Sequence, residues 1–204
     1  MFEKEKKGLE LLNKSSFIIP NVLSSGSLKQ QDYLILEYIK PGKSINWKIF
    51  GENLASLHQI TSQEFGLDYD NYIGSIEQIN SCDKNWFDFY ANKRLILLMK
   101  LARNKNLLTN KDCNEIERIC NSLKDIIPNS IPSLIHGDLW PGNIIGTENG
   151  VPVLIDPAVY YGHPEMDWAM LDLFGNFPKI SFDTYNEINP LEIGFQNRKY
   201  IFQF

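Results

Sequence analysis

The spacing of apolar residues along the chain predicts a fold that mixes helices and strands. Between Trp47 and Ile60, apolar residues recur every three or four positions, which predicts an amphipathic helix with Ser44 as a nearby cap. The same spacing predicts six further helices, over 1–12, 86–108, from a capping box at Thr109 and Asp112 to Pro128, over 165–175, over 182–188, and from 196 onward.

Short runs of strand-forming residues separate these helices. Tyr33 to Ile39 is rich in β-branched and aromatic residues, follows a predicted turn at Ser24–Gly26, and ends before Pro41-Gly42. Three more strands are predicted at Leu134–Ile135, Ile144–Ile145 and Val151–Ile155, and the last two flank a hairpin turn at 148–150. The predicted fold class is therefore α+β.

Composition narrows the class of protein. The chain has 204 residues, 43% of them apolar and 22% charged, as in a globular protein with a substantial core. Its net charge of −5 argues against a nucleic-acid partner, and no apolar run approaches the ~18 residues of a membrane span. Cys82, Cys113 and Cys120 form no Cys-x-x-Cys pair, which predicts reduced thiols in a cytoplasmic protein. The sequence does not indicate an oligomeric state.

The stretch from Ser133 to Asp156 carries the candidate chemistry. Asp138 follows a strand, Asn143 comes five positions later, and Asp156 stands at the end of the following hairpin. Two acids and an amide in this arrangement can surround one point. This suits phosphoryl transfer, in which one acid orients the acceptor hydroxyl while the amide and the other acid hold Mg²⁺ on the nucleotide phosphates.

The segment HGDLWPGN, followed by a hairpin and IDPA, resembles the fructosamine (ketosamine) kinase family. That family belongs to the aminoglycoside- and choline-kinase-like enzymes, which share the protein-kinase fold. The resemblance implies a small N-terminal lobe and a larger, mainly helical C-terminal lobe. It also implies ATP and Mg²⁺ as cofactors. The partner it implies is a ketosamine, either a small molecule or bound to a protein, and neither a nucleic acid nor a membrane.

The resemblance assigns roles to residues of the motif. It makes Asp138 the catalytic base, and Asn143 and Asp156 the two metal ligands. His136 and Gly137 shape the catalytic loop.

Outside the motif, the resemblance implies that Glu5 pairs with a strand lysine that grips the phosphates, and that backbone groups of Glu37 and Ile39 bind the adenine. Asp167 is expected to hold the catalytic loop through backbone hydrogen bonds. Trp140 is a candidate for packing on the acceptor, with a core role equally open.

Two histidines, His58 and His163, lie outside the motif. His163 is a second candidate for contact with the acceptor, although a histidine in a loop is more often incidental. We expect His58 to be a hydrogen-bonded core residue.

The resemblance also predicts domain boundaries and a departure from the family. Residues 1–39 correspond to part of the N-terminal lobe, 40–42 to the hinge and 43–204 to the helical lobe. The family's glycine-rich loop and strand lysine should precede Glu5, and one or two further helices should follow Phe204. The chain is therefore expected to be truncated at both ends, to bind Mg·ATP weakly, and to be slow or inactive as it stands.

Two alternatives remain at this point. One is another small-molecule kinase, of the aminoglycoside or choline type. The other is a non-catalytic, pseudokinase-like remnant that keeps the pocket without turnover. The Trp140-containing motif favours the ketosamine class over the first alternative.

Overall fold

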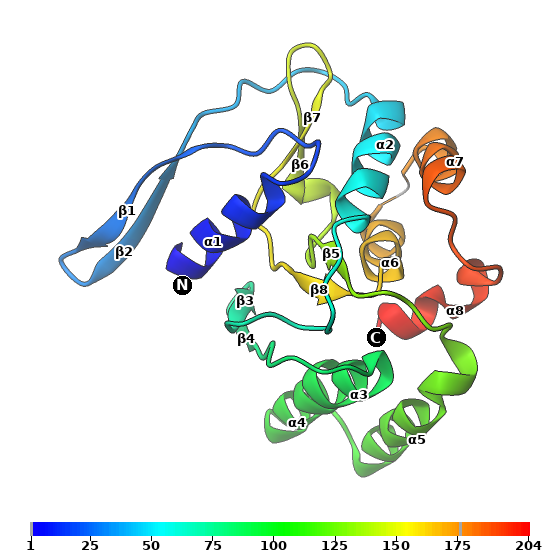
Figure 1. Ribbon diagram of the computed structural model, residues 1–204. Helices are drawn as coiled ribbons and strands as arrows, with labels where there is room; N and C mark the ends of the chain where they lie inside the picture. The colour runs from blue at the N-terminus through cyan, green and yellow to red at the C-terminus, as the bar shows by residue number, and fades with distance from the viewer. Residues whose placement is uncertain (1, 176) are drawn as a thin grey trace.

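A computed structural model describes residues 2–175 and 177–204 of the chain. Helix α1 and the long ribbon β1–β2 lie at one side of the molecule, and the ribbon projects away from the body (Figure 1). The remaining helices surround two short sheets in the body. This mixed α/β architecture confirms the predicted fold class.

The helices and strands follow the predicted order. The helices are α1 (Phe2–Leu12), α2 (Trp47–His58), α3 (Trp86–Tyr90), α4 (Ile96–Asn104), α5 (Asn110–Ile126), α6 (Glu165–Phe174), α7 (Lys179–Ile188) and α8 (Phe195–Phe202). The strands are β1 (Val22–Leu28), β2 (Gln31–Leu36), β3 (Asn71–Ile73), β4 (Ile76–Gln78), β5 (Ser133–Ile135), β6 (Ile144–Gly146), β7 (Pro152–Leu154) and β8 (Tyr160–Gly162). They pair antiparallel as β1–β2, β3–β4, β5–β8 and β6–β7.

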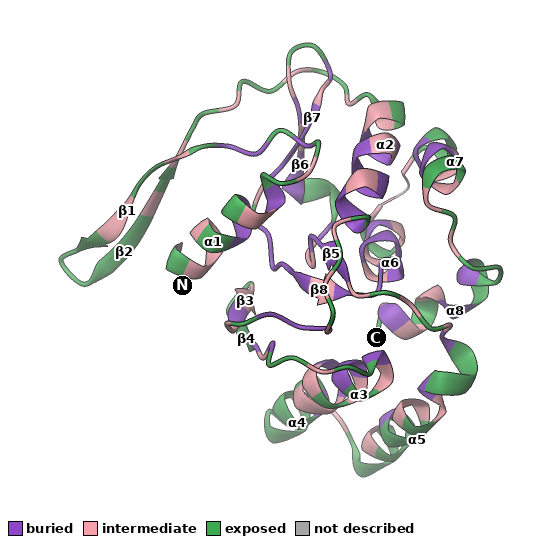
Figure 2. Ribbon diagram, viewed as in Figure 1, coloured by how far each residue is buried: buried purple, intermediate pink, exposed green. Residues whose placement is uncertain are grey.

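Helix α2 lies at the centre of the packing. Phe50, Leu54 and Leu57 of its apolar stripe are fully buried, as the 3.6-residue period predicts. Gly51 lets α7 approach closely, because a Cβ there would overlap the carbonyl oxygen of Ser181. In Figure 2 the buried residues of α2 and the neighbouring strands form one continuous interior. This packing places β5 beside α2 and fixes the start of the catalytic loop.

Two predicted boundaries are wrong, each for a local reason. The turn of the first ribbon lies at Lys29 and Gln30, both in the left-handed region with φ of 49° and 65°, and not at Ser24–Gly26, which is part of β1. The cap of α2 is Asn46, whose side chain accepts a hydrogen bond from the backbone of Ile49, and not Ser44. These corrections shift the ends of elements and leave their order unchanged.

The helix predicted over 86–108 is present from Trp86 to Asn104 and contains a π-helical turn. A π-helical turn, Ala91–Leu95, separates α3 from α4, which ends at Asn104. Arg94 in this turn is buried, and its guanidinium donates to the carbonyl oxygens of Ile79 and Lys93. We attribute the π turn to this inserted side chain.

The capping box at the start of α5 is confirmed. The Thr109 hydroxyl accepts from the backbone of Asp112, whose carboxylate accepts from the backbone of Thr109 at 2.7 Å. No helix in the described part of the chain is both long and apolar enough to cross a bilayer.

Candidate active site

The catalytic loop begins where β5 ends, and a buried carboxylate from α6 anchors it. Asp167 is 1% exposed and accepts hydrogen bonds from the backbone N–H groups of His136 (2.8 Å) and Gly137 (3.0 Å). A third contact at 3.2 Å comes from Nε2 of His58, which also contacts the Tyr185 hydroxyl at 2.8 Å. His58 is therefore a buried, hydrogen-bonded core residue, as predicted.

Gly137 is needed at its position because of both its backbone angle and its surroundings. Its φ is +80°, and a Cβ there would overlap the carbonyl oxygen of Ala158. His136 lies beside it with Nε2 donating to the carbonyl of Ile155 at 3.0 Å and Nδ1 accepting from the backbone of Asp138 at 3.3 Å. Burial lowers the pKa of His136, which agrees with this neutral tautomer.

The side chain of Asn143 joins the two acids predicted to act together. Its Nδ2 donates to the carbonyl oxygen (2.8 Å) and to Oδ2 (3.1 Å) of Asp138, and it lies 3.5 Å from the carbonyl oxygen of Asp156. The backbone N–H of Ile155 in turn donates to the carbonyl of Asn143 at 3.1 Å. The structure thus brings Asp138, Asn143 and Asp156 to one place.

The electrostatic setting of Asp138 suits a proton acceptor. The side chain is half-buried, and this burial raises the pKa of Asp138 above its usual value, while His136 and the hydrogen bond from Asn143 lower it. Its Oδ1 accepts no hydrogen bond from the residues that the structure describes. One carboxylate oxygen is therefore fixed by Asn143, and the other is free for a ligand.

Asp156 is exposed and lies close to helix α1. Together with Glu5 it lines a small cavity of about 20 Å³. Burial raises the pKa of Glu5, and the negative charge of Asp156 raises it further. Glu5, which the resemblance assigns to a lysine pair, thus lies beside the proposed metal ligand. Within the described ranges it forms no ion pair.

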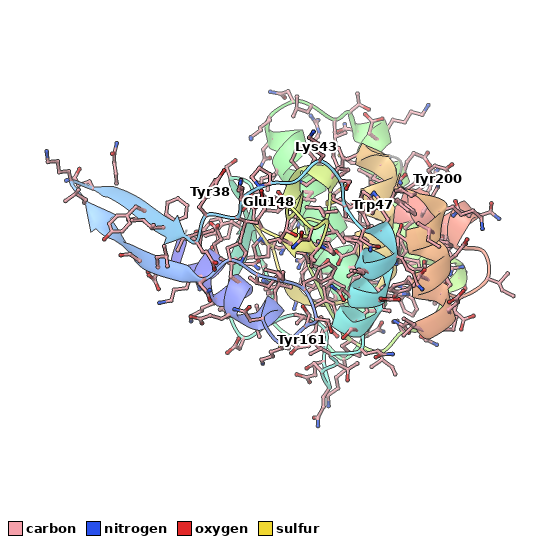
Figure 3. All side chains as sticks on the ribbon, turned by 90° about the horizontal axis from the view of Figure 1, so that it is seen from above. Tyr38, Lys43, Trp47, Glu148, Tyr161 and Tyr200 are labelled. Carbon is pink, nitrogen blue, oxygen red and sulfur yellow. The ribbon has the colours of Figure 1, made fainter. Side chains whose placement is uncertain are left out.

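The predicted hinge crosses the β6–β7 hairpin. The backbone of Gly42 donates to Gly146 and that of Asn46 donates to Gly150, both at 2.7 Å, and the exposed Lys40 pairs with Glu148. In Figure 3, Lys43 lies beside Glu148 on the same side of the molecule. The hairpin therefore fixes the segment that follows the predicted adenine-binding residues.

The backbone groups of Glu37 and Ile39 that are expected to bind adenine differ in the hydrogen bonds they form within the protein. The N–H of Glu37 donates to Asn21 at 2.8 Å, and its carboxylate accepts from the Asn21 side chain. The carbonyl of Glu37 and the N–H of Ile39 bond no backbone group of the described residues. Those two groups stay available to a base, and their role remains a prediction.

The two residues proposed to contact the acceptor lie in different surroundings. Trp140 is 41% exposed, covers Gly142, and packs edge-on against Phe174 with ring centroids 6.1 Å apart. It is therefore not a core residue, and it borders the catalytic loop from outside. Its contact with an acceptor stays a prediction.

The structure does not bring His163 to the site. It is buried between Trp86 and Phe202, with ring centroids 5.8 Å and 5.3 Å away, and burial lowers its pKa to about 3. It follows β8 at the end that pairs with Ser133, whereas the catalytic loop leaves β5 at the opposite end. We therefore assign His163 to the core.

A buried polar cluster that the sequence pattern does not predict supports the site. Asn71, Gln78, Asn80 and Arg94 are all buried and hydrogen-bonded to one another, next to the segment that follows Asp156. The only signal was Gly74-Ser75 between Ile73 and Ile76, because strands of three residues are too short to show an alternating pattern.

Known proteins resemble this chain along its whole length. A family model described as fructosamine kinase matches residues 1–204. A candidate ketoamine kinase from Synechocystis is 38% identical over 206 residues, covering 99% of this chain and 69% of its own length. A chloroplastic protein-ribulosamine 3-kinase from Arabidopsis thaliana is 37% identical over 207 residues, which cover 98% of this chain and 63% of the relative.

Solved structures share the fold. A candidate fructosamine-3-kinase from Haemophilus somnus superposes with a TM-score of 0.92 at 33% identity, covering all of this chain and 69% of the other. An aminoglycoside-3′-phosphotransferase of type VIII gives a TM-score of 0.58 at 15% identity, over 98% of this chain and 77% of the other. The second match shows a common kinase-like fold only, and confirms the predicted one.

Proposed function

Because this chain belongs to the fructosamine kinase family, we propose that it uses Mg²⁺-bound ATP to phosphorylate a hydroxyl of a ketosamine, free or attached to a protein. Its class is that of an ATP-dependent phosphotransferase of the fructosamine kinase type. Beyond this class, we propose Mg²⁺ as the metal, a ketosamine as the acceptor and a role for each residue of the site.

One observation carries the proposal: a single amide side chain touches both acidic segments. Asn143 contacts Asp138 through two hydrogen bonds and lies against the backbone of Asp156. A base for the acceptor hydroxyl and ligands for the nucleotide's metal must lie within a few ångströms of each other in phosphoryl transfer. Asn143 supplies that proximity.

The donor atoms fit Mg²⁺. Among the described residues no group of three or more His, Cys, Asp or Glu side chains could enclose a metal ion. Mg²⁺ on a nucleotide needs no such cage, since one or two protein oxygens and the phosphates complete its coordination. The exposed carboxylate of Asp156 and the side-chain amide oxygen of Asn143 would provide those oxygens.

Asp138 then acts on the acceptor. Asn143 holds Oδ2, so Oδ1 accepts the hydrogen bond of the substrate hydroxyl and orients its oxygen toward the γ-phosphate. As that oxygen attacks the γ-phosphorus of ATP, the bond from this phosphorus to the β,γ-bridging oxygen breaks and ADP leaves, while the hydroxyl proton passes to the Asp138 carboxylate. When bound, the metal neutralises charge that develops on the phosphate oxygens. The raised pKa of Asp138 strengthens it as a base at neutral pH.

The exposed Trp140 supports an acceptor that approaches along the outer face of the loop. A rim aromatic ring offers a flat apolar surface to a sugar-derived group and leaves room for whatever carries it. The Arabidopsis relative is named for a protein-bound ribulosamine, and we extend protein-bound ketosamines to this chain on that ground.

The test measures ADP release with ATP, Mg²⁺ and a peptide carrying a fructosamine, with an aminoglycoside as the competing acceptor. We expect slow transfer to the fructosamine peptide, and a loss of about 10²-fold or more in Asp138→Asn, the usual scale for loss of a general base. Asp125→Asn is the matched control, because this carboxylate is exposed on α5.

Two results contradict the proposal. One is full turnover in Asp138→Asn, and the other is a preference for the aminoglycoside. Nucleotide binding by the unaltered protein without any transfer supports the non-catalytic alternative.

A further inference from the structure

Asp156 has a backbone conformation that its surroundings must enforce. Its φ is +53°, in the left-handed region, and its side chain is exposed, so burial of the side chain does not hold it there. A residue other than glycine keeps such a conformation when neighbouring contacts fix the chain on either side. After Asp156, these contacts come from His136 and from residues 71–80, which lie far away in the sequence.

Two side-chain amides grip the chain just after Asp156. Nε2 of Gln78 donates to the carbonyl of Ala158 at 3.1 Å, and Nδ2 of Asn71 donates to the carbonyl of Val159 at 2.8 Å. From the opposite side, the N–H of Ala158 donates to the carbonyl of His136 at 3.0 Å. The segment is thereby fixed both to the β3–β4 hairpin and to the catalytic loop.

The two amides are themselves immobilised. Oδ1 of Asn71 accepts from Gln78 (2.9 Å) and from Asn80 (2.8 Å), and Oδ1 of Asn80 accepts from the Arg94 guanidinium at 2.7 Å. Arg94 also lies 4.2 Å from the ring centroid of Tyr160, directly after the gripped segment. These polar residues are all buried. A buried network whose members bond each other holds one geometry, because each alternative leaves polar groups unpaired.

The β3–β4 hairpin extends to the proposed metal ligand, Asp156. Asn71, Tyr72 and Gly74 line the small cavity beside Asp156 and Glu5. Helix α1, the hairpin and the loop of Asp156 therefore meet at one point, and the hairpin is the part of that junction with a rigid polar interior.

We propose that Asn71 and Gln78 are positioning residues that hold the Asp156 loop in its metal-binding conformation. The inference rests on the proposed function for the metal role of Asp156. The loop is then a fixed part of the site, and the β3–β4 hairpin acts as its support although it contributes no group to the chemistry.

The first test follows hydrogen exchange in the unaltered protein. If the network fixes the loop, the amide of Ala158 exchanges about as slowly as that of Tyr161, which donates to Gly66 from β8. Rapid exchange of the Ala158 amide in a protein whose β5–β8 pair is protected overturns the inference, whatever any variant does.

The second test uses Gln78→Met, which keeps the length of the side chain and removes its donor, and Asn71→Ala. Ser181→Ala is the matched control, since it removes one buried hydrogen bond, to Pro178, in α7. We expect exchange of the Ala158 amide to rise at least tenfold in the two hairpin variants and to stay unchanged in the control. Equal exchange in all three overturns the inference.

The third test reads the metal site by electron paramagnetic resonance, with Mn²⁺ and ADP as the probe. Gln78→Met should weaken Mn²⁺ binding about tenfold, the low end for loss of a group behind a metal ligand. A higher concentration of Mg²⁺ should restore the rate of phosphoryl transfer by Gln78→Met. Retained Mn²⁺ affinity in Gln78→Met, when Asp156→Asn loses it, overturns the inference alone. Retained affinity in Asp156→Asn counts against the proposed function, and the exchange data still decide the inference.

Discussion

Replacing Asp167 by Asn should separate support of the catalytic loop from the chemistry of that loop. Oδ2 of Asp167 accepts from His136 and contacts His58, while Oδ1 accepts from Gly137. An asparagine can keep its carbonyl oxygen at the Oδ2 position and serve two partners. Its amide nitrogen must then face the N–H of Gly137, which replaces one hydrogen bond by two opposed donors.

The expected cost follows from that single lost contact. A hydrogen bond to a charged group contributes about 1.5–3 kcal/mol, and the buried N–H of Gly137 is left without an acceptor. We expect the free energy of unfolding to fall by about 2–3 kcal/mol, and the melting temperature by roughly 4–12 °C at ~2–4 °C per kcal/mol for a chain of this size. Turnover should fall as well, because the loop that carries Asp138 loses its anchor.

Differential scanning calorimetry and the ADP-release assay together give the result, with Asp138→Asn as the comparison. The same chemical change at the half-buried Asp138 should abolish turnover and leave the melting temperature nearly unchanged. The reasoning is refuted if Asp167→Asn melts within about 1 °C of the unaltered protein, since an anchor of this strength cannot be removed without cost. It is also refuted if Asp138→Asn unfolds in step with its loss of activity.

Three further outcomes follow from the same geometry. Burial raises the pKa of Asp138, so the transfer rate should fall as the pH drops through a value above the usual pKa of aspartate. The same burial disfavours the ionised carboxylate in the folded protein at neutral pH, so Asp138→Asn should not lower stability there. A pH–rate profile checks the first effect, and a pH–melting profile checks the second. Gly137→Ala should lower stability by about 2 kcal/mol or more, measured by urea denaturation, because φ is +80° and the added carbon meets Ala158. Thr109→Ala should lower stability by about 1 kcal/mol, because it removes the capping box, and should leave the transfer rate unchanged. A loss of transfer along with the loss of stability would contradict the remote position of Thr109.

The part of the site that the sequence predicted is the part built from near neighbours. Asp138 and Asn143 are five residues apart on one loop, and Asp156 is joined to them by a single hairpin with a glycine at its turn. In such a segment, spacing in the sequence nearly determines spacing in the structure. The helices of the body were predicted for a similar reason, since their apolar period repeats over at least two turns.

The parts that were missed depend on contacts between distant segments. Strands β3 and β8 have three residues each, too few to show an alternating pattern. The π turn at Ala91–Leu95 contains Arg94, whose guanidinium donates to the carbonyls of residues 79 and 93. The first ribbon turns at Lys29 and Gln30, and the turn preferences of lysine and glutamine do not predict their positive φ.

The site divides its tasks between groups that face solvent and groups that do not. Asp156 is exposed and Asp138 half-buried, whereas the residues that hold their segments, Asp167, Asn71 and Gln78, are at most 6% exposed. Burial raises the cost of losing a hydrogen bond, so the supports are constrained by stability and the chemical groups are constrained by activity alone. A descendant that lost catalysis would therefore be free to change Asp138 and Asp156 first while keeping its supports. This chain retains both sets, and the contacts of Asn143 still join the two acids, which favours an enzyme over a non-catalytic remnant.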